Sequence, residues 1–202
     1  MSIDLTLGGL LICVYLAGFV LLTRKASTAA GRNVDDFARP VGAQRWTALL
    51  FRLGFIGGGL WGATRALIPE LSPAWPVGLA WVSVSALGLA LAGMWLALAA
   101  QAQMAASWRI GAVEGTLGTL VSDRFFAISR NPVFVGQMML FAGLALVRPD
   151  PVQALLSLAV WLAAIWQVRI EEPVLRASLG ETYRAYAART PRWLGLRKGQ
   201  KQ

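Results

Sequence analysis

Four polar residues in the second half of the chain have the types and the spacing of a chemical site. Arg130 and Asn131 precede one apolar run, and Glu171 and Glu172 follow the next one. Arg130 lies 18 residues before the turn at 148–151 and Glu171 lies 20 residues after it, which corresponds to roughly 27 and 30 Å of helix. Two antiparallel helices of these lengths bring a cation, an amide and two carboxylates to one end of a hairpin. The residues alone fit two interpretations, a polar site and a structural Arg–Glu clamp.

The chain offers few other groups for chemistry. It contains no histidine, and its one cysteine, Cys13, lies in an apolar run where we expect it to pack. The sequence therefore excludes catalysis by a histidine acid or base, and it lacks the usual nitrogen and sulfur ligands of metal centres. We expect no metal site.

The composition predicts an integral membrane protein. Of the 202 residues, 56% are hydrophobic and 14% are charged, whereas a soluble domain has about 25% charged residues. A net charge of +9 would suggest a nucleic-acid partner for a soluble protein. Here the cations lie between apolar runs, where they mark cytosolic loops and contact anionic lipid, so we expect membrane lipids and no nucleic acid as partners.

Five apolar runs provide the elements that position the polar residues. They cover residues 5–23, 46–68, 77–100, 133–147 and 152–168. We expect an all-α integral membrane protein with about five transmembrane helices, folded as a single domain over residues 1–202. Residues 1–100 contribute three spans, and residues 101–202 contain a two-span hairpin. An amphipathic helix at 173–189 should follow and lie in the membrane interface, with Leu175, Leu179, Tyr183 and Tyr186 three and four residues apart.

The fourth run is too short to cross the hydrocarbon core alone. Its 15 residues cover roughly 22 Å of a core about 30 Å thick. Residues 130–132 should therefore lie at or slightly below the interface. Pro132 has no N–H and disfavours helix at the preceding residue, so we expect the span to begin directly after Asn131.

The distribution of cations predicts the orientation. Sixteen of the 19 Lys and Arg residues follow the first, third and fifth runs, and positive residues gather on the cytosolic side. We therefore expect an outside N-terminus and a cytosolic C-terminus, in the inner membrane of a bacterium. Tryptophans near the run ends should anchor the interface; these are Trp46, Trp75, Trp108 and Trp193.

Small residues at helical spacing predict close helix packing. Gly54, Gly58 and Gly62 are four residues apart in the second run, and Ala86, Gly88, Ala90, Ala92 and Gly93 lie in the third. Such patterns let helix backbones approach closely in lipid. The glycines fit packing within one chain and packing between two, so the oligomeric state stays open.

Three motifs in a fixed order resemble a known family. They are Arg130-Asn131-Pro132-Val133-Phe134-Val135-Gly136, then Glu171-Glu172, then Leu179-Gly180-Glu181-Thr182-Tyr183-Arg184-Ala185-Tyr186. Together they resemble the isoprenylcysteine carboxyl methyltransferase family, whose wider group includes membrane phospholipid N-methyltransferases. The resemblance covers residues 107–193. Asn131 stands where eukaryotic members usually have His, and Phe134 replaces the usual Tyr.

The resemblance implies an enzyme that uses S-adenosylmethionine and a lipophilic acceptor that enters from the bilayer. It places the cofactor in a cytosol-facing pocket, so that residues 101–202 form the cofactor-binding region. The implied cofactor-binding residues are Arg130, Asn131, Pro132, Phe134, Gly136, Glu171, Glu172, Tyr183 and Tyr186. Residues 1–100 are expected to contribute only spans.

Three residues are expected to act on the acceptor. Arg109 and Arg169 could orient an anionic group, although anchoring at the cytosolic face is an alternative role for each. An anionic acceptor needs no base, whereas a neutral thiol or a protonated amine must lose a proton, and Glu171 or Glu172 is then the candidate base.

The expected acceptor is a carboxylate of the isoprenylcysteine type. Three alternatives remain from the sequence: methylation of a phospholipid amine or a hydrophobic thiol, a non-enzymatic transporter or structural membrane protein, and a related-fold reductase that uses a nicotinamide cofactor.

Overall fold

Five long helices form the body of the protein. The computed structural model describes residues 3–35, 37, 40–71, 80–110, 119–147 and 149–195. The long helices are α1 (Ile3–Ala30), α2 (Gln44–Leu67), α3 (Ala80–Met104), α5 (Pro132–Val147) and α6 (Pro151–Arg189), and the short ones are η2 (Pro69–Leu71), η3 (Ala105–Ser107) and α4 (Phe125–Ile128). All five expected apolar runs are helical, and the expected start of the third at residue 77 lies outside the described residues. The all-α fold is confirmed.

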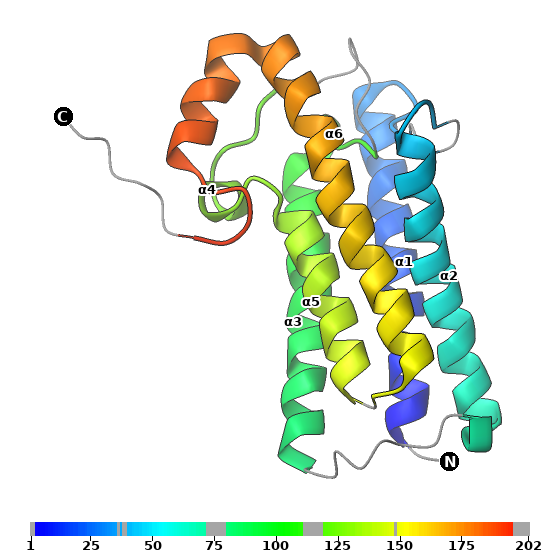
Figure 1. Ribbon diagram of the computed structural model, residues 1–202. Helices are drawn as coiled ribbons and strands as arrows, with labels where there is room; N and C mark the ends of the chain where they lie inside the picture. The colour runs from blue at the N-terminus through cyan, green and yellow to red at the C-terminus, as the bar shows by residue number, and fades with distance from the viewer. Residues whose placement is uncertain are drawn as a thin grey trace.

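The helices pack as a closed ring. Each contacts two main neighbours, in the order α1, α2, α6, α5, α3 and back to α1, and Figure 1 shows all five running nearly parallel to one long axis. The N-terminus, the α5–α6 turn and the end of α2 lie at one end of this bundle. The segments that follow α1 and α3 and the C-terminal part of α6 lie at the other end.

Glycines make the closest helix contacts, as the sequence predicts. A Cβ on Gly62 would lie 2.8 Å from the Cα of Gly9 in α1, and a Cβ on Gly54 would clash with a methyl of Val160 in α6. A Cβ on Gly136 would lie 2.5 Å from the backbone nitrogen of Ala97 in α3. These contacts show that the glycines pack within one chain.

The α5–α6 turn is held by a buried ion pair. Nη1 of Arg65 in α2 lies 2.7 Å from Oδ2 of Asp150, and both side chains are less than 5% exposed. Asp150 also caps α6, because its Oδ1 accepts a hydrogen bond from the backbone N–H of Gln153. The Asp150 carboxylate is therefore buried together with the Arg65 guanidinium that it neutralises.

The last helix differs from its expected boundaries. The sequence predicts a span at 152–168 and a separate helix from Pro173, whereas α6 runs through both without a break at Pro173. The chain instead turns at Gly180, with φ 54° and ψ −129°, a conformation essentially restricted to glycine. After Gly180 the helix folds back toward α4 (Figure 1). The amphipathic segment is therefore divided, and it covers the end of the bundle.

Three helical stretches are long and apolar enough to cross a membrane. Among the described residues these are Gly8–Ala30, Trp81–Ser107 and Pro151–Arg189. α5 is apolar but has 16 residues, which is short for a span. α2 carries three arginines and five glycines.

Cys13 is exposed on the surface of the helix bundle. The expectation that it packs within the protein is therefore wrong.

Candidate active site

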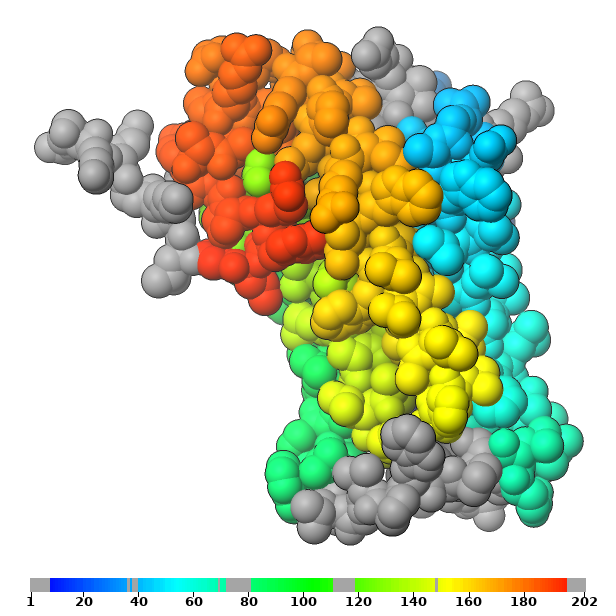
Figure 2. Space-filling model, viewed as in Figure 1, coloured from blue at the N-terminus to red at the C-terminus, as the bar shows by residue number. Residues whose placement is uncertain are grey.

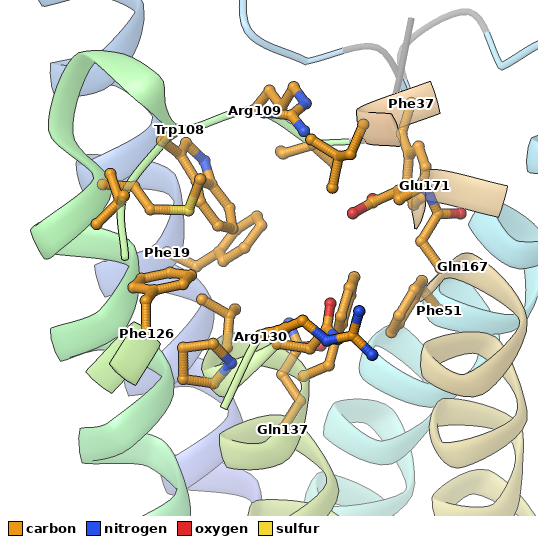
Figure 3. A pocket seen from close by; sticks show the side chains of 18 of the residues that line it. Phe19, Phe37, Phe51, Trp108, Arg109, Phe126, Arg130, Gln137, Gln167 and Glu171 are labelled. Atoms are coloured by element: carbon orange, nitrogen blue, oxygen red, sulfur yellow. The ribbon is translucent and has the colours of Figure 1, made fainter. Parts of the chain in front are cut away.

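A cavity lies inside the ring at the end of the bundle that carries the α1–α2 and α3–α5 connections. Its volume is about 370 Å³, within the range of small-molecule sites. Figure 3 shows its labelled side chains surrounding an open centre, with Arg109 and Glu171 on one side and Arg130 and Gln137 on another. Side chains from α1, α2, α5, α6 and the segment after α3 all line it.

The start of α5 brings Arg130 and Asn131 to this cavity. Pro132 is the first helical residue, as expected, and the carbonyl of Asn131 accepts the first helical hydrogen bond, from Val135. The Asn131 N–H donates to Oγ of Ser129. The Asn131 backbone is therefore bonded on both sides, and this fixes the direction in which its side chain leaves the helix.

A short C-terminal strap, residues 190–195, lies across this start. Nδ2 of Asn131 donates to the carbonyl of Arg192 over 2.9 Å, and the Arg130 N–H donates to the carbonyl of Pro191 over 2.9 Å. The Gly195 N–H donates to the carbonyl of Ile128. Figure 2 shows the last described residues, in red, against α5 and α6. The strap therefore holds the start of α5 in place, although none of its residues lines the cavity.

Glu172 forms the structural clamp that the sequence allows. Arg192 donates to it from Nε over 2.9 Å and from Nη2 over 2.7 Å. Arg130 lies 3.2 Å from one carboxylate oxygen and Arg176 lies 3.7 Å from the other. Hydrogen bonding to Glu172 raises the pKa of Arg192 despite partial desolvation of the guanidinium. The buried carboxylate therefore joins α6, the start of α5 and the strap.

Glu171 has a different environment from its neighbour. It lines the cavity, and its Oε1 accepts a hydrogen bond from Nε2 of Gln167 over 2.9 Å. Gln167 is fully buried, and its Oε1 in turn accepts from the hydroxyl of Thr47 in α2 over 2.6 Å. This chain of side chains orients the Glu171 carboxylate from the α2 side.

The part of α6 around Gly180 roofs the cavity. Leu175 and Leu179 come from before the turn, Tyr183 and Tyr186 come from after it, and all four line the cavity. The Tyr186 hydroxyl donates to the carbonyl of Phe126 over 2.7 Å. The turn at Gly180 thus places both tyrosines over the site while α6 continues beyond the bundle.

Aromatic side chains from the first two helices form much of the wall. Tyr15 stacks on Phe55 with ring centroids 5.2 Å apart, and Phe51 stacks on Phe134 of α5 at 5.9 Å. Trp108 is buried and donates from Nε1 to Oγ1 of Thr23. Trp108 also lines the cavity. Because it is buried there, the expectation that it anchors the interface is wrong.

A comparison with protein families assigns the chain. Residues 79–182 match the sequence model of the family described as phospholipid methyltransferase, which is slightly more than half of the chain. The chain belongs to the phospholipid methyltransferase family. Comparisons with curated proteins and with solved structures give no significant match. With its apolar helices, the protein is a membrane methyltransferase.

The family match lies within the wider group that the sequence suggests. It does not confirm membership of the isoprenylcysteine carboxyl methyltransferase family itself. The matched residues begin beside the start of α3 and end within the roof, so they include both motifs of the α5–α6 hairpin. α1 and α2 lie outside the match.

Most of the predicted site residues of this methyltransferase meet at the cavity. Eight of them line it: Arg109, Arg130, Asn131, Pro132, Phe134, Glu171, Tyr183 and Tyr186. Three do not. Gly136 packs against Ala97 of α3, Arg169 is exposed on α6, and Glu172 is paired with arginines. Their positions follow from helix rotation, because neighbouring residues on a helix point to different sides.

Several cavity residues of the methyltransferase escape the motif comparison. Tyr15, Gln137 and Gln167 lie within apolar runs, where an uncharged polar group is itself a signal of a site or of a polar helix contact. Phe51 and Phe55 carry no such signal. Their presence shows that residues 1–100 contribute a wall of the cavity in addition to spans.

Proposed function

We propose that the protein transfers a methyl group from S-adenosylmethionine to a lipophilic acceptor that enters the cavity from the bilayer. The observation that carries the proposal is the composition of the cavity in a member of this family. Charged and amide side chains of the predicted cofactor motifs share one cavity with a wall of aromatic rings. The polar part suits the cofactor, and the aromatic part suits a lipophilic acceptor.

The residues present fit the groups of the cofactor. Glu171 offers a carboxylate for its positively charged amino group. Arg130 offers a donor for its carboxylate, because Nε of this side chain is buried without a hydrogen-bond partner in the described structure. Phe134, Tyr183 and Tyr186 offer ring surfaces for the adenine. These five side chains all reach one cavity.

Alignment and exclusion of water account for the work of the protein residues. When bound, S-adenosylmethionine supplies a methyl group already activated by a sulfonium. Gln167 orients Glu171, and the roof residues keep water away from the reacting atoms, which together favour an in-line displacement. A chain without histidine can perform these tasks.

Two acceptor classes have support from an observation. An isoprenylcysteine-type carboxylate suits Arg109, which lines the cavity and could bind it with two parallel hydrogen bonds. A phospholipid amine suits the family description and the Glu171 carboxylate, which could accept the proton that such an acceptor must lose. A thiol acceptor has no comparable support in the cavity.

Two experiments test the proposal in order. Calorimetric titration of the detergent-purified protein with S-adenosylhomocysteine should show saturable binding, and failure to bind would remove the cofactor from the proposal. Methyl-labelled S-adenosylmethionine should then label one fraction of a separated membrane lipid extract. Label that mild alkali releases as volatile methanol identifies a carboxyl methyl ester. Label from the phospholipid fraction that stays non-volatile after alkali identifies a methylated amine.

A further inference from the structure

The floor of the cavity is a hydrogen-bonded pair, Tyr15 of α1 and Gln137 of α5. Nε2 of Gln137 donates to the Tyr15 hydroxyl over 2.7 Å, and both side chains line the cavity. Gln137 lies five residues after Pro132, the first residue of α5, which is about 7.5 Å further along the helix axis. Figure 3 shows Gln137 below Arg130. The pair therefore lies deeper in the bundle than Arg130 and Asn131.

This pair presents an unused acceptor. Gln137 is 5% exposed, and its Oε1 is buried with no hydrogen-bond partner among the described residues. Burying an amide oxygen without a donor costs free energy, and most buried polar atoms in folded proteins are paired. An unpaired acceptor on a buried side chain that lines a cavity therefore indicates a ligand that brings the donor.

The surroundings of the pair define the rest of that ligand. Tyr15 stacks on Phe55, and Phe51 stacks on Phe134, so the nearby wall is made of ring carbons. A charged group at this depth would lose its hydration without gaining a counter-ion from the pair. The chemistry selects an apolar molecule with a neutral donor, a hydroxyl or an amide N–H.

We propose that Oε1 of Gln137, held in place by Tyr15, binds a hydroxyl or amide N–H of the methyl acceptor and sets how deeply the acceptor enters. This inference rests on the proposed function, because it takes the occupant of the floor to be the methyl acceptor. Gln137 is thereby a specificity residue for the acceptor and not part of the cofactor site.

The inference can be tested without knowing the natural acceptor. The probes are a twelve-carbon alcohol that carries a diazirine in its chain and the methyl ether of the same compound, which lacks the donor. With wild-type protein in lipid nanodiscs and probe below saturation, the alcohol should crosslink about 2- to 10-fold more than the ether, as expected for one hydrogen bond. Peptide mapping should place the crosslinks on α1 and α5.

Two variants and one matched control assign this preference to the floor. Gln137→Met keeps the length of the side chain and removes the amide, so it should abolish the preference for the alcohol. Tyr15→Phe removes the hydroxyl that holds Gln137 and should reduce the preference. Gln101→Met is the control, because Gln101 is equally buried and also has an unpartnered Oε1, but it does not line the cavity. It should keep the preference of the wild type.

The outcomes separate this inference from the proposed function. Equal crosslinking of alcohol and ether by the wild type would overturn the floor site, whether or not the variants fold. Loss of S-adenosylhomocysteine affinity in Gln137→Met would also overturn it, because Gln137 would then belong to the cofactor site. Failure of the wild type to bind S-adenosylhomocysteine, with the alcohol preference intact, would instead reject the proposed function and leave a lipid-binding floor.

Discussion

At the scale of single residues, two adjacent glutamates have separate tasks. Glu171 lines the cavity and is oriented by Gln167, whereas Glu172 contacts Arg130, Arg176 and Arg192. The sequence leaves a chemical site and a structural clamp as alternatives. The structure shows the clamp on Glu172 and places Glu171 at the cavity, where the proposed function uses it.

The two glutamates should respond differently to the same substitution. Glu171→Gln should weaken S-adenosylhomocysteine binding by roughly 1.5–3 kcal/mol, or about 10- to 150-fold, because the amide keeps the shape and loses the charge. Glu172→Gln should instead lower the free energy of unfolding by roughly 1–3 kcal/mol, because it leaves three arginines without their anion. Calorimetry and thermal unfolding in detergent measure the two effects.

Each variant is the control for the other. Equal loss of cofactor affinity in both, with unchanged melting temperatures, would show that Glu172 also contacts the cofactor. Wild-type affinity in Glu171→Gln would remove this carboxylate from the cofactor site.

At the scale of helices, α5 has two functional faces. Gly136 and Gly143 contact the backbone of α3, while Phe134 and Gln137 line the cavity. The small residues bring α5 against α3 so closely that the position of the cavity wall depends on them. The glycine of the family motif therefore acts here through packing.

Glycine-to-alanine substitutions at two helical positions should separate packing from helix propensity. Gly136→Ala places a Cβ 2.5 Å from the backbone nitrogen of Ala97, and overpacking of this kind costs roughly 1–3 kcal/mol. Gly88→Ala is the matched control, because a Cβ at Gly88 meets nothing within 4 Å. That change should stabilise the protein by up to about 1 kcal/mol, or leave it unchanged. A melting temperature that falls equally in both variants would argue against the α3–α5 contact as the cause.

The turn in α6 should matter for the cofactor as well as for stability. Gly180→Ala meets no atom within 4 Å, so its cost of roughly 1–3 kcal/mol comes from the backbone conformation alone. Because Tyr183 and Tyr186 follow the turn, we expect a lower melting temperature together with weaker S-adenosylhomocysteine binding.

Gly31→Ala provides the comparison for the turn. Gly31 also has a positive φ and open space, but it does not line the cavity. The alanine variant should lose stability and keep the cofactor affinity of the wild type. If Gly180→Ala kept its affinity as well, the roof would not take part in cofactor binding.

At the scale of the whole molecule, the two ends of the bundle differ in character. The cavity, the strap and most of the described cations lie at one end, and the buried Arg65–Asp150 pair closes the other. Some of the cations and one of the expected tryptophan anchors lie outside the described residues; these are Arg39, Arg148, Arg197, Lys198, Lys201 and Trp75. The positive-inside rule predicts that the cavity end faces the cytosol.

Cysteine labelling tests this orientation. Cys13 is exposed, so the background must carry Cys13→Ser. In intact cells a membrane-impermeant maleimide should label Glu70→Cys and not Arg32→Cys, because α1 and α2 connect at the cavity end and η2 lies at the other (Figure 1). Asp150 is unsuitable as a reporter since it is buried. Labelling of position 32 from outside would reverse the orientation and move the cofactor site away from the cytosol.

Much of this arrangement can be derived from the sequence, because it depends on local rules. Apolar runs set the helices, Pro132 sets the start of α5, and equal helix lengths from the 148–151 turn bring Arg130 level with Glu172, as their 3.2 Å contact confirms. The spacing of Leu175, Leu179, Tyr183 and Tyr186 predicts one face of one helix, whereas the turn at Gly180 divides that helix and the four side chains reach the cavity from both sides of the turn.

Other features depend on how the helices rotate and meet, and only the tertiary structure decides them. Consecutive helical residues point about 100° apart, so the packing of α6 against α2 determines that Glu171 faces the cavity while Glu172 faces the arginines. The contribution of Tyr15 and Phe55 follows from the closing of the ring by α1 and α2. No local pattern contains this information, because each of these contacts joins segments that are distant in the chain.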